Sequence, residues 1–87
     1  MGEYLLLTFN STNFAMQAES QLKALGMEFQ VIPTPREITR SCGLSIKTSF
    51  ENKVKVDELK NEEKIKIKAM YNVSMITGVK TFKEVGR

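Results

Sequence analysis

The residues best suited to chemistry lie in one short segment between Pro33 and Gly43, which contains the chain's only cysteine, Cys42. A cysteine reacts through its thiolate, and a thiol with an ordinary pKa of about 8.5 is only slightly ionised at neutral pH. Arg36 and Arg40 precede Cys42, and nearby guanidinium groups stabilise a thiolate. These residue types indicate a thiol whose reactive thiolate form is stabilised.

The same segment has the residues of an anion-binding turn. Arg36 and Arg40 are four positions apart, so on a helical turn they share one face and can hold a phosphate, a carboxylate or a sulfur oxyanion. Glycine after the cysteine lets a partner molecule approach the backbone closely. The candidate reactive residue is therefore Cys42, as its thiolate. The candidate binding residues are Arg36, Arg40, Ser41 and Gly43.

Two simpler interpretations compete with this one. Cys42 can be a small buried hydrophobic residue, and the two arginines can belong to a solvated turn that Glu37 neutralises. If the turn is helical, Cys42 also lies near its C-terminal end, where the helix dipole disfavours a negative charge. Any lowering of the thiol pKa must then come from the arginines.

The absence of histidine narrows the chemistry. It excludes a Cys-His dyad, a Ser-His-Asp triad and every histidine-based metal site. Acidic residues in the second half are interleaved with lysines, which is typical of a solvated helix surface. We expect no metal and no cofactor, and a carrier or binding module rather than an enzyme with its own acid–base groups.

Length and composition predict a single domain over residues 1–87, with a compact core at about 3–73 and an extra edge strand or a tail at 74–87. The longest apolar run is far too short to span a membrane, and the N-terminus lacks a signal-peptide pattern. One cysteine cannot form an internal disulfide. We therefore expect a cytoplasmic protein, and a homodimer would cover more apolar surface.

The first half of the chain predicts two strands and one helix. The apolar run over residues 4–9 is typical of a central strand that is buried on both faces. Capping residues and helical spacing then predict a helix at about 11–25, ended by Gly26. Residues 28–32 predict a second strand. Prolines end it, and a capping box over 34–37 starts a short helical turn that Gly43 stops.

The second half adds two strands and a helix. Alternating apolar residues predict a half-buried strand over 44–50. Residues 54–60 favour a short helix, although the valines there fit a strand equally well. The clearest alternation covers residues 65–73 and predicts a strand. A turn at residues 77–78 precedes the final edge strand or tail.

This β-α-β-β-α-β order predicts an α+β protein with a ferredoxin-like fold, in which one antiparallel sheet has two helices on one face and a polar opposite face. Lys64, Lys66 and Lys68 would lie on one sheet face, with Lys47 beside them, as in some RNA-binding domains. That face has no aromatic motif to stack bases, so solvated lysines that discourage edge pairing are favoured. Nucleic acid is not an expected partner.

The chain resembles the selenium/sulfur carrier protein-like family, a small bacterial domain, over roughly residues 3–73. The resemblance includes the opening strand at residues 4–9, with Ala15 and Glu19 in the helix that follows. It rests more strongly on residues 33–38, with the sequence PTPREI, leading to residues 41–46, with the sequence SCGLSI.

The resemblance implies that Cys42 carries sulfur or selenium, as a persulfide or selenosulfide, between a protein donor and a protein acceptor. Arg36 and Gly43 then belong to the motif around the cysteine. An alternative is a non-catalytic ferredoxin-like regulatory or interaction module, in which the turn with Arg36 and Arg40 binds an anion and Cys42 is structural.

Overall fold

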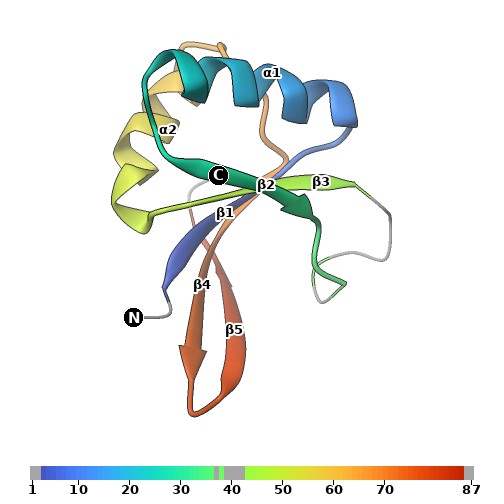
Figure 1. The fold of residues 1–87 in the computed structure, drawn as a ribbon, viewed down its shortest axis with the longest axis vertical. Helices are drawn as coiled ribbons and strands as arrows, with labels where there is room; N and C mark the ends of the chain where they lie inside the picture. The colour runs from blue at the N-terminus through green and yellow to red at the C-terminus, as the bar shows by residue number, and fades with distance from the viewer. Residues whose placement is uncertain (1–2, 37, 39–42, 86–87) are drawn as a thin grey trace.

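The computed structural model describes residues 3–36, 38 and 43–85. Along the chain, the helices and strands follow the order β-α-β-β-α-β-β, with a 3₁₀ turn before the second α-helix (Figure 1). The strands are β1 (Tyr4–Thr8), β2 (Phe29–Pro33), β3 (Leu44–Thr48), β4 (Ala69–Ile76) and β5 (Val79–Glu84). The helices are α1 (Thr12–Ala24), the 3₁₀ turn η1 (Phe50–Asn52) and α2 (Lys53–Asn61).

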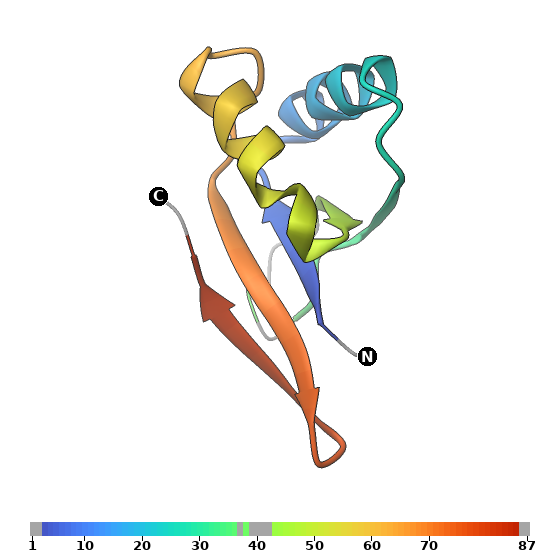
Figure 2. The same cartoon turned by 90° about the vertical axis from the view of Figure 1, so that its left-hand side faces the viewer.

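The five strands form one sheet in the order β2-β3-β1-β4-β5, and every neighbouring pair is antiparallel. Both helices cover the same face of this sheet (Figure 2). The first four strands and two helices have the split β-α-β connectivity of the ferredoxin-like fold, with β5 added outside β4. The predicted fold class is therefore confirmed.

Strand β1 lies at the centre and is buried on both faces, as its apolar run predicts. Leu5, Leu6 and Leu7 have no exposed surface. Burial of a side chain of this size contributes about 1.5–3 kcal/mol. Leu5 and Leu7 face the helices, where the core is completed by Ala18, Leu22, Ile46, Val56, Leu59, Ile65 and Met70.

Helix α1 confirms the helix predicted at about residues 11–25. Ser11 is its N-cap, and the Ser11 hydroxyl accepts a hydrogen bond from the Phe14 N–H at 3.3 Å. At the other end Gly26 has a φ of 73°. The amides of Gly26 and the next residue donate back to the last turn at 3.0 and 3.1 Å, which closes a Schellman cap. This local sequence fixes where α1 begins and ends.

The second half contains one confirmation and one correction. Residues 53–61 form a helix, so the strand alternative for the valines there is wrong. The strand predicted from residue 65 begins only at Ala69, and residues 65–68 belong to the connection before it. Ile65 is 1% exposed and packs into the core from this connection. Burial of Ile65 therefore produces the alternating apolar pattern in residues 65–68, although these residues do not form a strand.

The predicted lysine face of the sheet does not form, because most of its lysines precede β4. The Lys66 ammonium lies 6.0 Å from the centre of the Phe14 ring, at the start of α1. Lys47 is in β3, and its ammonium lies 4.5 Å from the centre of the Tyr4 ring. At this distance the ammonium is attracted by the ring face. The lysines are therefore divided among separate surfaces.

The face of the sheet opposite the helices is more apolar than predicted. Strand register places Leu6 and Val73 on this face, and both have no exposed surface. Tyr4, Tyr71 and Phe82 lie on the same face and are half-buried. The aromatic side chains shield the smaller apolar ones, so this face does not simply alternate apolar with polar residues.

Strands β4 and β5 form a hairpin, the arm, which projects beyond the helices (Figure 2). Thr77 and Gly78 make its two-residue turn with φ values of 49° and 79°. Two positive φ values are typical of a type I′ turn, which fits the twist of the flanking strands. Three large apolar side chains near the tip are more than half exposed: Met75, Ile76 and Val79.

Candidate functional site

The structure describes two of the candidate site residues, Arg36 and Gly43. Arg36 is exposed and lies in a turn in which the Ile38 N–H donates to the Pro35 carbonyl at 3.1 Å. Glu37 and the other three candidates lie outside the described residues: Arg40, Ser41 and Cys42. Their predicted roles therefore stay predictions.

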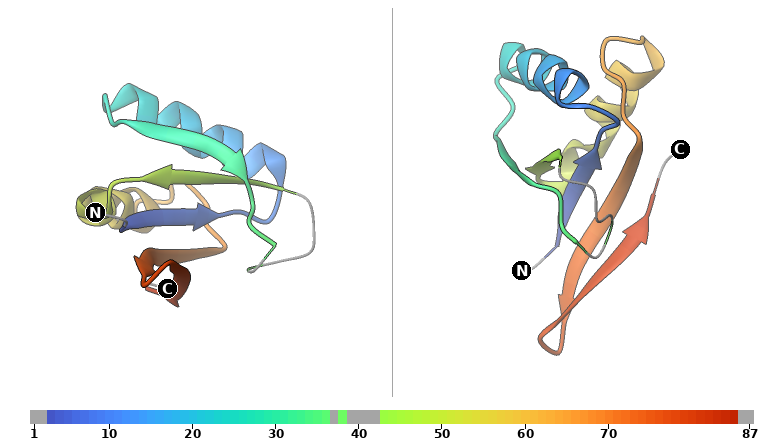
Figure 3. Two further views of the ribbon diagram at one scale, coloured as in Figure 1. Left: turned by 60° about the horizontal axis from the view of Figure 1, so that its bottom comes forward. Right: turned by 90° about the vertical axis from the view of Figure 1, so that its right-hand side faces the viewer.

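Described residues that precede and follow Cys42 in the chain line a cleft of about 390 Å³. The cleft lies where β1 passes into α1. Figure 3 shows the start of α1 and the end of β2 at the same end of the sheet. The β1–α1 junction contributes residues 8–12. The β2–β3 connection and the segment around the start of β4 contribute Thr34, Ile38, Gly43, Leu44, Lys68 and Tyr71.

Hydrogen bonds between β1 and β4 fix one wall of the cleft. The Lys68 N–H donates to the Thr8 carbonyl at 2.8 Å, and the Thr8 hydroxyl donates to the Ala69 carbonyl at 3.1 Å. Thr8 is 3% exposed, so its hydroxyl is satisfied inside the protein rather than by water. These bonds hold the start of β4, and with it Lys68, beside the end of β1.

A second set of hydrogen bonds fixes the ends of the β2–β3 connection. The Thr34 N–H donates to the Gly43 carbonyl at 3.0 Å, and the Thr34 hydroxyl lies 2.6 Å from the hydroxyl of Ser45. Ser45 has no exposed surface. Thr34 therefore anchors the described ends of the segment that contains Cys42.

The backbone does not require glycine at position 43. Among the described glycines, only Gly26 and Gly78 have a positive φ, so Gly43 is not the left-handed helix stop that was predicted. A Cβ at Gly43 would lie 3.7 Å from the Thr34 hydroxyl oxygen, which is an ordinary contact. Among the described residues, no contact of this position requires glycine.

The described lining of the cleft favours negative charge. It contains the cation Lys68 and no acidic side chain. Helix α1 begins at the cleft, and its first turn has no acidic residue. The amides at a helix N-terminus and a nearby ammonium both stabilise an anion. The cleft is therefore suited to a thiolate, a persulfide anion or an oxyanion.

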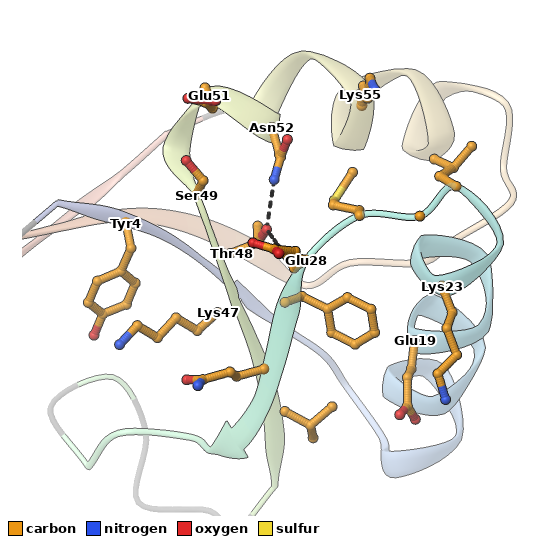
Figure 4. A pocket seen from close by; sticks show the side chains of 16 residues that line it. Tyr4, Glu19, Lys23, Glu28, Lys47, Thr48, Ser49, Glu51, Asn52 and Lys55 are labelled. Atoms are coloured by element: carbon orange, nitrogen blue, oxygen red, sulfur yellow. Dashed lines mark hydrogen bonds between the residues drawn. The ribbon is translucent and has the colours of Figure 1, made fainter.

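A second and more open hollow, the β2 groove, runs along the outer edge of β2 and has a volume of about 1150 Å³ (Figure 4). Inside it the Asn52 side-chain amide donates to the Thr48 hydroxyl at 2.9 Å, and that hydroxyl donates to the Glu28 carbonyl at 2.7 Å. Its charged residues have both signs: Glu19, Glu28, Glu51, Lys23, Lys47 and Lys55. The β2 groove therefore has no preference for an anion.

Sequence reasoning missed Lys68 and Tyr71 as cleft residues. Both are far from Cys42 along the chain, and only the position of β4 beside β1 brings them to the β2–β3 connection. The ferredoxin-like strand order was the signal that could have found them. Arg36, by contrast, is not among the described residues that line the cleft.

Metal ligands and membrane-spanning helices were also sought among the described residues. In the described ranges, no group of three or more cysteine or acidic side chains is placed to hold a metal ion. None of the described helices is long and apolar enough to cross a membrane.

Comparison with known families adds one match. The model of the family described as "Putative Se/S carrier protein-like" matches residues 4–72, which include the Cys42 segment and every described residue of the cleft. No curated protein and no solved structure matches the chain. Because the match covers most of the 87 residues, the chain belongs to the Se/S carrier protein-like family.

Proposed function

We propose that the chain is a carrier of sulfur or selenium, in which the Cys42 thiolate takes one such atom from a protein donor and passes it to a protein acceptor. The observation that carries the proposal is the family match over residues 4–72, because this span contains the only cysteine of the chain. The cytoplasm suits this role, since its thiols are kept reduced.

The transfer needs no external oxidant or reductant. The Cys42 thiolate attacks the terminal sulfur of a donor persulfide, so that a new S–S bond forms at Cys42 while the donor S–S bond breaks and the donor leaves as a thiolate. An acceptor thiolate then attacks the terminal sulfur of the Cys42 persulfide, and Cys42 leaves as a thiolate. The terminal sulfur keeps its proton throughout, and a selenosulfide follows the same two steps.

The charge distribution around the cleft supports this chemistry. Cys42 must be anionic both when it attacks and when it leaves. Lys68 and the start of α1 favour negative charge at the cleft. In the proposal they act together with Arg36 and Arg40, and Gly43 gives the donor and acceptor access to the thiol.

The proposal is tested by the intact mass of the chain after incubation with a small-molecule persulfide and, separately, with a selenosulfide. We expect one added sulfur or selenium atom per chain, lost on mild reduction and absent from Cys42→Ser. Ser20→Ala is the matched control, because it changes an exposed hydroxyl of α1 outside the cleft and should load like the natural chain. A chain that takes up neither atom would contradict the proposal.

The rate of loading separates a carrier from an ordinary thiol. A peptide with the sequence of residues 36–43 provides the unfolded reference. We expect the folded chain to react at least about tenfold faster at neutral pH, with a midpoint for alkylation below about 8.5. Equal rates would favour the interaction module, in which Cys42 is structural.

A further inference from the structure

The tip of the arm carries an apolar surface that the proposed function does not use. Ile76 and Val79 pair across the hairpin next to the turn, and Met75 precedes Ile76 in β4. The side chains of Met75, Ile76 and Val79, the apolar tip, are 51%, 58% and 63% exposed. Because successive side chains of a strand point to opposite faces, the apolar tip covers both faces of the hairpin. Large apolar residues grouped on an exposed surface typically mark an interaction site.

Positive charge lies directly behind the apolar tip. Lys80 follows it in β5, and Lys83 lies three residues further on, about 10 Å along the strand. Both lysines are exposed, and residues 74–83 contain no acidic residue. Acidic residues occur only toward the base of the arm, where Glu84 ends β5 and Glu3 accepts a hydrogen bond from a β4 side chain at 2.7 Å. The outer part of the arm is therefore apolar at its end and basic behind it.

We infer that the apolar tip inserts into the surface of an anionic lipid bilayer, with Lys80 and Lys83 at the lipid headgroups. Insertion removes the three apolar side chains from water, which is favourable. The lysines are attracted by the negative potential of anionic lipids. Apolar insertion and basic charge are two signals that together hold a protein on a bilayer surface without any segment that spans it.

The dimensions of the arm fit this arrangement. From the turn to Met75 is two residues, about 7 Å along the strand. Segments that lie in the interface bury their apolar side chains about 5–10 Å into the boundary between headgroups and acyl chains. The apolar tip therefore fits within this layer. The backbone groups of Thr77 and Gly78 lie outside the strand pairing, and they would be costly to place in hydrocarbon. Insertion therefore stops at the boundary, where water still reaches the turn.

The size and shape of the apolar tip favour a bilayer over a protein partner. A specific protein interface takes about 20–30 residues from each side, whereas the apolar tip has three. The tip is the end of a projecting hairpin (Figure 2), so a protein would need a deep pocket to cover it, whereas lipid chains rearrange around it. The cleft includes residues at the start of β4, so insertion of the other end of β4 leaves the cleft in solvent.

Cosedimentation of the full chain with vesicles of mixed phosphatidylcholine and phosphatidylserine tests the inference. We expect binding that weakens as salt is added, and that is weaker on vesicles of phosphatidylcholine alone. Ile76→Asp should weaken binding at least about tenfold, because it places a charge in the apolar layer. Val54→Asp is the matched control, since Val54 is 67% exposed on α2, outside the arm, and this variant should bind like the natural chain.

The lysines are tested in the same assay. Lys80→Gln should weaken binding about fivefold on vesicles that contain phosphatidylserine and should have little effect on phosphatidylcholine alone. Lys55→Gln removes an exposed charge from α2 and is the matched control. Equal binding of the two variants to anionic vesicles would contradict the role of the arm lysines.

Fluorescence gives a second readout of insertion. The chain has no tryptophan, so Val79→Trp supplies a single reporter at the tip. Its emission should shift to shorter wavelength on anionic vesicles and be quenched by brominated acyl chains, whereas Val54→Trp should show neither change. A natural chain that leaves the vesicles unbound, or an Ile76→Asp variant that binds them equally well, would overturn the inference and favour a protein pocket as the partner of the tip. These readouts do not involve Cys42, so their failure is distinct from failure of the carrier proposal.

Discussion

The cleft and the arm both include part of strand β4, but the two ends of this strand differ in polarity and exposure. The first residues of β4 are tied to β1 by hydrogen bonds and help to form a polar cleft whose described lining contains no acidic side chain. The last residues, Met75 and Ile76, are exposed and apolar. The family match ends at Asn72, between these two halves. The contrast indicates that the cleft and the exposed apolar tip of the arm are separate parts of one strand.

This separation suits a carrier, which has to meet a donor and then an acceptor at the same thiol. The exposed tip of the arm lies at the other end of β4 from the cleft, so the arm leaves the cleft open to both. The comparison predicts that a change in one region leaves the other region intact.

The largest expected effect is that of Cys42→Ser on the cleft side. It removes the only thiol of the chain, so sulfur loading should be lost completely. Hydrogen exchange in β4 and β5 should match that of the natural chain, because the arm does not include this residue. Intact mass and hydrogen exchange on the same preparation measure both quantities. Faster exchange in the arm would contradict the separation of the two regions.

Removal of the buried hydroxyl contact at the cleft should have the next largest effect. Thr34→Val leaves the hydroxyl of Ser45 buried without its partner at 2.6 Å, which costs about 1–3 kcal/mol in the free energy of unfolding. The double variant Thr34→Val with Ser45→Ala removes both hydroxyls and should recover much of this loss. Urea unfolding measures the free energy of unfolding of the natural chain and of each variant. A double variant as unstable as Thr34→Val would show that the hydroxyl pair is not the cause.

The arm should become more stable on Thr77→Asn. Thr77 is a β-branched residue at a φ of 49°, where asparagine is tolerated better, and Asn-Gly is a preferred sequence of type I′ turns. We expect a gain of about 1 kcal/mol, seen as slower hydrogen exchange in β4 and β5. Sulfur loading should not change. Faster exchange in the arm would mean that the turn does not have this conformation.

The smallest effect is expected for the removal of one positive charge from the cleft. Lys68→Gln should slow loading of Cys42 about two- to fivefold at neutral pH, because an exposed cation contributes about 0.2–1 kcal/mol to an anion nearby. Lys55→Gln in the β2 groove is the matched control and should load at the natural rate. Equal rates for the two variants would show that the cleft does not stabilise the anion.

The fold was predictable where the sequence contains local signals. Ser11 and Gly26 mark the ends of α1, and the apolar run of β1 marks the central strand. The start of β4 was not predictable, because Ile65 is buried from a connection and imitates a strand pattern. For β5 the sequence predicted the turn at residues 77–78 but left an edge strand and a tail open, because the exposed residues of β5 do not alternate in hydrophobicity. Its pairing with β4 makes it an edge strand.

The candidate site was predictable only in part. Cys42 and its neighbours were recognisable from their residue types, and Gly43 does line the cleft. Lys68 and Tyr71 enter the cleft through strand order, which brings together residues that are distant along the chain. Local patterns hold no information on such long-range neighbours, so only the predicted ferredoxin-like strand order could have placed these two residues at the cleft.

The discharge of loaded sulfur tests the carrier proposal most directly. Chain loaded with one sulfur atom at Cys42 is mixed with an acceptor thiol, and the intact masses of both are followed with time. The account predicts that the sulfur leaves Cys42, that it is recovered on the acceptor, and that the chain returns to its original mass and can be loaded again. A chain that keeps its sulfur in the presence of the acceptor would contradict it. A Cys42→Ser variant that is loaded as well as the natural chain would contradict it too.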